Sequence, residues 1–214
     1  MEDTLHHKQM RSDLVNRLRN KGISDPQVLK AINNVPRHLF IEDHENREAY
    51  DDKPLEIGEG QTISQPYTVA YQSALLDLHK GEKILEIGTG SGYQAAILFE
   101  MGADVYTVER NHKIHASTKL RLSQLGYSQI HTFYADGNEG LSQHAPFDKI
   151  LVTAAAPGVP AKLVDQLKTG GYLVIPVNGK IQKMLRVIKT APNATSVQEY
   201  DDFRFVPLLT GTVH

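Results

Sequence analysis

The chain has 214 residues, no cysteine, a formal net charge of −2 and a mean hydropathy of −0.36. Its length favours one domain around one core. The near-neutral charge argues against a nucleic-acid surface, which needs clustered Lys and Arg, and the lack of cysteine excludes disulfides and thiolate metal sites. No apolar run reaches the length of a membrane span and no signal-peptide pattern is present, so we expect a cytoplasmic protein that binds neither membrane nor nucleic acid.

The N-terminal part predicts two helices and a long loop. An apolar stripe that includes Leu14 predicts a helix over residues 9–21. Asp25 followed by proline is typical of the start of a second helix, which ends at Pro36. Residues 36–60 lose the periodicity and are rich in turn formers, which predicts an ordered loop on the surface.

The segment QTISQP, residues 61–66, precedes an apolar and small-residue stretch that predicts a helix beginning at Pro66. Ser64 and Gln65 therefore approach a helix N-terminus. Two interpretations stay open here. The side chains cap the helix, or they and the adjacent N–H groups face an anionic substrate.

The stretch KILEIGTGSG, residues 83–92, indicates a short buried strand that stops at a glycine loop. A helix-compatible run over 93–100 follows, and a β-branched strand over 104–109 ends in Glu109. In nucleotide-binding folds, a carboxylate at the tip of the second strand holds the ribose hydroxyls of the cofactor. The sequence therefore predicts a site for such a cofactor.

The spacing of Gly88, Gly90 and Gly92 narrows the choice of cofactor. It is Gly-x-Gly-x-Gly, whereas dinucleotide sites use Gly-x-Gly-x-x-Gly. Glu86 would repel a pyrophosphate but suits an ammonium or sulfonium group. The pattern favours S-adenosylmethionine, with NAD as the weaker alternative and a tight turn without a ligand as the third.

Strands and helices continue to alternate along the chain, with strands predicted over 130–134, 147–153 and 172–177, and helices over 113–125 and from Pro160. Asp136 follows the first of these strands, where it either accepts a hydrogen bond from an adenine amino group or forms an Asx turn. His112 and His115 lie one helical turn apart, but no third ligand at metal spacing accompanies them, so we expect no metal.

The pattern changes near the C-terminus. Asn178-Gly179 is a strong hairpin signal, so the strand before it is expected to pair antiparallel with a strand over 184–188. A last strand is predicted over 197–206.

Together these elements predict an α/β fold with a doubly wound, mostly parallel, seven-stranded sheet, an antiparallel C-terminal hairpin and an α-helical N-terminal extension. We expect the whole chain to form a single domain, with residues 1–60 as the extension and its loop and residues 61–214 as the core. The carboxyl ends of parallel strands meet at one edge of a sheet, so Glu86, Glu109 and Asp136 are expected to converge on one crevice.

Seven segments carry a resemblance that covers nearly the whole chain: VPRHLF (35–40), GEGQTISQPYTVA (58–70), LEIGTGSGYQAA (85–96), VYTVER (105–110), VTAAAPGVP (152–160), QLKTGGYLVIPV (166–177) and RFVPLL (204–209). They resemble the protein-L-isoaspartate O-methyltransferase family, and QTISQP with RFVPL is more specific than the glycine loop. Two positions depart from the family pattern: Glu56 stands where proline is usual, and Ala135 where glycine is usual.

The resemblance implies a Rossmann-like methyltransferase fold and transfer of a methyl group from S-adenosyl-L-methionine to L-isoaspartyl residues of proteins and peptides, leaving S-adenosyl-L-homocysteine. It implies that Ser64 is the active-site serine and that Ile63, Val206 and Leu208 line the isoaspartyl cleft. The implied cofactor residues are Glu86, Gly88, Gly90, Glu109, Asp136 and Gly137. We expect a monomer without a metal.

Two other classes of function stay open. A methyltransferase of the same fold acting on RNA or a small molecule is disfavoured by the lack of a basic patch and by QTISQP. A non-catalytic module that binds the cofactor and acts through protein contacts is the third hypothesis.

Overall fold

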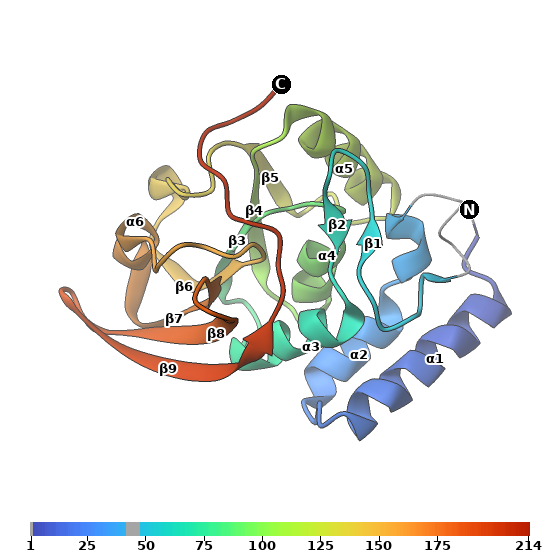
Figure 1. The fold of residues 1–214 in the computed structure, drawn as a ribbon. Helices are drawn as coiled ribbons and strands as arrows, with labels where there is room; N and C mark the ends of the chain where they lie inside the picture. The colour runs from blue at the N-terminus through green and yellow to red at the C-terminus, as the bar shows by residue number, and fades with distance from the viewer. Residues whose placement is uncertain (1, 42–47) are drawn as a thin grey trace.

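The computed structural model describes residues 2–41 and 48–214. Its helices are α1 (Leu5–Asn20), α2 (Pro26–Asn34), the 3-10 turn η1 (Arg37–Phe40), α3 (Pro66–Leu75), α4 (Tyr93–Glu100), α5 (His112–Gln124), η3 (Ser142–His144) and α6 (Ala161–Asp165) (Figure 1). Its strands are β1 (Leu55–Glu56), β2 (Thr62–Ile63), β3 (Lys83–Ile87), β4 (Asp104–Glu109), β5 (His131–Tyr134), β6 (Phe147–Val152), β7 (Leu167–Val177), β8 (Gln182–Ala191) and β9 (Ala194–Phe203).

The main sheet has seven strands in the order β5-β4-β3-β6-β7-β8-β9. All neighbours from β5 to β7 pair parallel, whereas β8 pairs antiparallel with both β7 and β9. The predicted mostly parallel sheet with an antiparallel C-terminal hairpin is therefore confirmed. Chain order runs outward in both directions from β3 and β6, and at such a reversal a crevice opens at the carboxyl ends of the strands.

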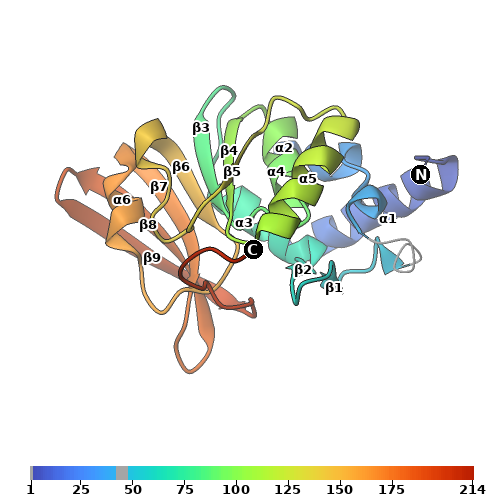
Figure 2. The ribbon, with the colours of Figure 1, turned by 90° about the horizontal axis from the view of Figure 1, so that it is seen from above.

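Alternation along β3 directs side chains to two cores, one on each face of the sheet. Ile84 packs into a cluster with residues of α1 to α4, and Leu85 and Ile87 pack into a second cluster with Leu163 of α6. Figure 2 shows α4 and α5 on one side of the sheet and α6 on the other. The sheet is thus covered on both faces, as a doubly wound fold requires.

The N-terminal helices form where predicted, with one boundary moved. Asp25 caps α2 by accepting from the Gln27 and Val28 N–H groups. However, α1 starts at Leu5 rather than at residue 9, because Thr4 and His7 form a reciprocal capping box that the apolar stripe does not indicate. In Figures 1 and 2, α1 and α2 lie beside α3 and α4, at the opposite end of the molecule from β9.

The expected loop over 36–60 contains more regular structure than the composition indicated. Residues Arg37–Phe40 form η1, and Leu55 pairs with Ile63 in a short antiparallel ladder between β1 and β2. Residues 42–47 lie outside the described part of the chain. The ladder makes residues 55–63 a small hairpin that leads directly into α3.

The bounds of the last three strands differ from the predicted ones. β8 spans Gln182–Ala191 instead of 184–188, and β9 starts at Ala194 instead of residue 197. β7 starts at Leu167 instead of residue 172, with an irregularity opposite β6, and Gly171 lies inside it, where a Cβ would come within 2.7 Å of the Asp148 carbonyl oxygen. β9 ends at Phe203 instead of residue 206, because the chain turns back to the sheet and the Ala155 N–H donates to the Val206 carbonyl at 2.8 Å. This return brings Val206 to the carboxyl ends of the parallel strands.

Within the described residues, no helix combines the length and apolar character needed to cross a bilayer.

Candidate active site

Two adjoining cavities of about 220 and 70 Å³ open at the carboxyl ends of the parallel strands. They share the wall residues Gln61, Gly88, Glu109 and Ala154. The larger cavity is lined by the ends of β3 and β4 and by the C-terminal segment, and the smaller one by the glycine loop, β2 and Ser64. This is the crevice that the strand order predicts.

The glycine loop after β3 adopts the conformations that require glycine. Gly88, Gly90 and Gly92 all have positive φ angles, of 98°, 50° and 86°. At Gly88 a Cβ would stand 2.5 Å from the Thr153 hydroxyl oxygen, which itself donates to the Ile87 and Gly88 carbonyls. The loop is therefore packed against the end of β6, and both cavities contact it.

Glu109, the last residue of β4, faces both cavities and is held by two backbone amides. Its Oε2 accepts from the Gly90 N–H at 3.0 Å and its Oε1 accepts from the Asn111 N–H at 2.9 Å. These bonds fix the carboxylate plane and leave each oxygen a further lone pair for a ligand. They also occupy the amide of the loop that a pyrophosphate would need.

Glu86 does not line the crevice, contrary to expectation, and lies fully buried beneath the glycine loop. It follows Ile84 in the alternation of β3 and so points to the α4 side of the sheet. The Thr107 hydroxyl donates to its Oε2 at 2.5 Å and lies 2.7 Å from the Thr89 hydroxyl, while Oε1 has no hydrogen-bond partner. Burial, reinforced by the charge of Glu109, raises the pKa of Glu86 to about 8.

The raised pKa of Glu86 predicts a pH-dependent stability. Because the pKa rises from an ordinary 4.5 to about 8 on folding, its contribution is fully present below pH 4.5 and is lost as the pH rises through 8. Glu86→Gln, which cannot ionise, should therefore show a smaller fall in stability from pH 5 to pH 8 than the parent chain. Thermal unfolding of both, without ligand, measures the difference; parallel curves would contradict the assignment.

Asp136 also lines neither cavity, although its neighbour Gly137 lines the larger one. Its Oδ1 accepts from the Asn138 backbone and side-chain amides, and its Oδ2 accepts from the Gly211 N–H at 2.6 Å. These hydrogen bonds outweigh partial burial and lower its pKa. The Asx turn is thus present, and the same carboxylate holds the C-terminal segment over the larger cavity. Of the expected three carboxylates, only Glu109 reaches the crevice.

The C-terminal segment forms one wall of the larger cavity. Leu208 N–H donates to the Ala155 carbonyl at 2.7 Å, and Arg110 donates to the carbonyls of Gly211 and Thr210. Arg110 is the sole Lys or Arg among the described residues that line either cavity, and its guanidinium is committed to these carbonyls. The crevice accordingly offers little to a phosphate and suits a ligand without one.

Ser64 lies in the smaller cavity, between the end of β2 and the start of α3. The N-cap residue Gln65 makes no side-chain cap; instead Oδ1 of Asp52 accepts from the Tyr67 N–H at 2.8 Å. The interpretation of Gln65 as the cap is therefore wrong, and the Tyr67 N–H is not available to an anionic substrate. Ser64 is left facing the cavity without a part in the cap.

Eight of the ten residues expected at the site line the two cavities: Ile63, Ser64, Gly88, Gly90, Glu109, Gly137, Val206 and Leu208. Sequence reasoning missed Thr153 and the Thr89–Thr107 pair, because single threonines give no signal. It also missed Asn111 as a partner of Glu109, although its place as the cap of α5 was recognisable.

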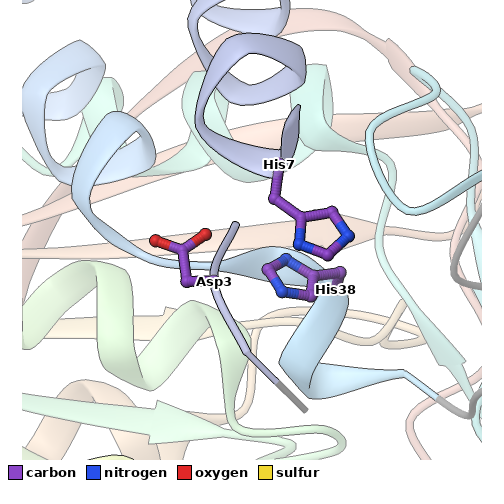
Figure 3. Close-up of side chains that lie close together, drawn as sticks. All are labelled: Asp3, His7 and His38. Carbon is purple, nitrogen blue, oxygen red and sulfur yellow. The ribbon is translucent and has the colours of Figure 1, made fainter. Parts of the chain in front are cut away.

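A separate cluster of possible metal ligands lies in the N-terminal region, and its residues line neither cavity. Asp3, His7 and His38 each bring a ligand atom within 4.8 Å of the others. Figure 3 shows the three side chains close together. Both oxygens of Asp3 already accept from Arg11 at 2.9 Å, and Nδ1 of His7 takes part in the capping box of α1. These hydrogen bonds explain why the three side chains lie together: they anchor the N-terminal residues to α1.

The crevice fits a nucleoside cofactor without phosphates. Apolar walls from Ile87, Val108 and Leu208 flank the larger cavity, and Glu109 stands at its junction with the smaller one. The side-chain oxygen Oε1 of Gln94, beside the glycine loop, is buried and accepts no hydrogen bond. An ammonium group on a ligand would supply the missing donor. Fold and site together define a Rossmann-like methyltransferase.

Comparisons with known proteins specify the family. A family model described as Protein-L-isoaspartate(D-aspartate) O-methyltransferase matches residues 8–213. A protein of Christiangramia forsetii named Protein-L-isoaspartate O-methyltransferase is 50% identical over 209 residues, which cover 98% of each chain. The chain therefore belongs to the protein-L-isoaspartate(D-aspartate) O-methyltransferase family.

Solved structures agree with this assignment. One named protein-L-isoaspartate O-methyltransferase superposes with a TM-score of 0.84 at 30% identity, over 92% of this chain and 65% of that chain. A Plasmodium falciparum protein, described as a candidate member of the family and solved with S-adenosyl-L-homocysteine, superposes with a TM-score of 0.82 at 25% identity. That alignment covers 93% of this chain and 98% of the other.

Proposed function

We propose that the protein transfers the methyl group of S-adenosyl-L-methionine to the free carboxylate of L-isoaspartyl residues in damaged proteins. The observation that carries the proposal is the pair of adjoining cavities, one walled by Glu109 and the glycine loop and the other by Ser64. Because the two cavities are adjacent and share lining residues, a cofactor in one and a carboxylate substrate in the other can meet end to end. Family membership supports the same substrate class.

The cofactor would occupy the larger cavity and extend along the glycine loop. When bound, it supplies an electrophilic methyl group on a sulfonium. Glu109 would accept hydrogen bonds from the ribose hydroxyls. Gly88 and Gly137 line the same cavity and Gly90 the adjoining one, so their backbones would lie along the ligand. Glu86 would act from below, by supporting the loop through Thr107 and Thr89, and Asp136 by holding the C-terminal wall.

The substrate end needs little acid–base chemistry. A carboxylate with a pKa near 4 is already ionised at neutral pH, so no strong base is required. Alignment is the main task, and it could contribute on the order of 7 kcal/mol. Ser64 would donate a hydrogen bond that orients one carboxylate oxygen, with Ile63 and Val206 as apolar walls.

Ser64→Ala should lower kcat/KM for an isoaspartyl peptide roughly 10- to 100-fold, because a hydrogen bond to a charged group contributes about 1.5–3 kcal/mol. Affinity for S-adenosyl-L-homocysteine should not change, since Ser64 lies at the substrate end. Ser117→Ala, which removes a hydroxyl bonded to the Ile114 carbonyl on α5, is the matched control. Full activity of Ser64→Ala would remove the serine from the mechanism.

The ester product leaves the protein, and attack of its backbone nitrogen on the ester expels methanol and forms a succinimide. Hydrolysis of the succinimide by water gives normal aspartate in part. Incubating an isoaspartyl peptide with the protein and S-adenosyl-L-methionine should therefore convert it to the aspartyl form over repeated cycles. Chromatography of the two peptides with time measures this. If the isoaspartyl peptide persists equally with and without the cofactor, the proposed function is wrong.

A monomeric state, a cytoplasmic location and a single domain with an extension over 1–60 stay predictions.

A nucleic-acid substrate is further disfavoured because the Arg110 guanidinium at the crevice is bonded to C-terminal carbonyls.

A further inference from the structure

The segment Glu48–Glu56 is fastened to the N-terminal helices by three arginines. Arg37 Nε donates to the Ala49 carbonyl at 2.8 Å, Arg17 donates to the Tyr50 carbonyl at 2.6 Å, and Arg11 donates to the Tyr50 hydroxyl at 3.1 Å. Ala49 and Tyr50 are buried, with exposed fractions of 0% and 1%. These contacts hold the backbone immediately before Asp52 in one position.

Asp52 joins this anchored segment to the start of α3. Its Oδ1 accepts from the Tyr67 N–H at 2.8 Å, its carbonyl accepts from the Gln65 side-chain amide at 3.0 Å, and its Oδ2 lies 2.5 Å from the Lys21 ammonium. The carboxylate is 11% exposed and sits at the positive end of the helix dipole. It replaces the cap that the N-cap residue Gln65 does not provide.

Ser64 is held between two attachments that both come from this segment. On one side, Leu55 pairs with Ile63 in the β1–β2 ladder, and on the other Asp52 holds Gln65 and Tyr67. We propose that Asp52 is a positioning residue for the reaction, which sets the direction of Ser64 into the substrate cavity by capping α3 from the anchored segment. The N-terminal helices thereby contribute to the site without contacting a ligand.

The expected change in kcat/KM rests on the proposed function, whereas the expected change in amide exchange at Tyr67 does not. If Asp52 acts only as a helix cap, its loss costs stability and nothing else. If it positions Ser64, its loss also changes the handling of the peptide while leaving cofactor affinity intact, because Glu109 and the glycine loop are held by other contacts. Asp25, which caps α2 away from the crevice, provides the matched control.

The test compares Asp52→Ala, Asp52→Asn and Asp25→Ala in the full chain. Both alanine variants should lower Tm by about 2 to 4 °C, as loss of one cap does in a chain of this size. Only Asp52→Ala should lower kcat/KM for the isoaspartyl peptide by tenfold or more at unchanged affinity for S-adenosyl-L-homocysteine. Asp52→Asn keeps an acceptor for the Tyr67 N–H and should recover most of the loss.

Amide hydrogen exchange gives the second readout and needs no activity. The Tyr67 amide and its neighbours should exchange at least tenfold faster in Asp52→Ala, and as slowly as in the parent chain in Asp52→Asn and Asp25→Ala. Equal kcat/KM for the two alanine variants would overturn the inference even if the Tyr67 amide exchanges faster in Asp52→Ala, because loss of a cap alone also speeds that exchange. A parent chain that methylates no isoaspartyl peptide would refute the proposed function instead, and exchange at Tyr67 would still decide whether Asp52 orders this turn.

Discussion

Glu109→Ala should weaken binding of S-adenosyl-L-homocysteine at least about 100-fold, because two hydrogen bonds to a charged acceptor contribute about 1.5–3 kcal/mol each. The loss has a second origin in the loop. The Gly90 and Asn111 N–H groups lose their acceptor, so the glycine loop and the start of α5 are no longer tied together. Isothermal titration calorimetry measures the effect.

Two further variants separate the causes. Glu109→Gln keeps the volume but presents an amide donor to one of the two N–H groups, so most of the loss should remain. Glu59→Gln removes another carboxylate at the same cavity, one that pairs with Lys113 at 3.3 Å, and should change affinity less than threefold. Equal effects of Glu59→Gln and Glu109→Gln would mean that only the local charge matters.

Gly88→Ala is expected to lower both stability and cofactor affinity. At φ 98° any L-residue costs about 1–2 kcal/mol, and the added Cβ would stand 2.5 Å from the Thr153 hydroxyl oxygen. The crowding should cost about 1–3 kcal/mol more and should push the loop toward the crevice, with at least a tenfold loss of affinity.

Gly81→Ala is the control for the free-energy cost of placing an L-residue at a positive φ angle. Gly81 has a similar φ of 85°, but a Cβ there meets nothing within 4 Å. Thermal unfolding should therefore show a clearly larger loss for Gly88→Ala, and only Gly88→Ala should bind S-adenosyl-L-homocysteine more weakly. Equal stability losses would show that the contact with Thr153 relaxes without cost.

The parts of the fold that the sequence predicts are those with local signals. Hydrophobic runs located β3, β4 and β6, Asp25-Pro26 located the start of α2, and Asn178-Gly179 located the hairpin between β7 and β8. The end of β9 was wrong because RFV has strand propensity, whereas the backbone of Val206 bonds to Ala155, 51 positions earlier. Long-range pairing of this kind leaves no trace in local composition.

The same division applies to the site. Gly88, Glu109 and Ser64 occupy the crevice as predicted, since strand ends and helix starts are readable from spacing. Glu86 was misplaced because one step of strand alternation decides whether a side chain enters the crevice or the core. Asp52 could not be found, because its partner Tyr67 is 15 residues away and the intervening segment has no periodicity.

The central claim is tested most directly by offering labelled S-adenosyl-L-methionine and two peptides that differ only in carrying L-isoaspartate or normal L-aspartate. The structure and the family membership predict a base-labile methyl ester on the isoaspartyl peptide alone. Equal labelling of both peptides would contradict the specificity and indicate a general carboxyl methyltransferase. Labelling of neither, with S-adenosyl-L-homocysteine binding intact, would contradict the reaction itself.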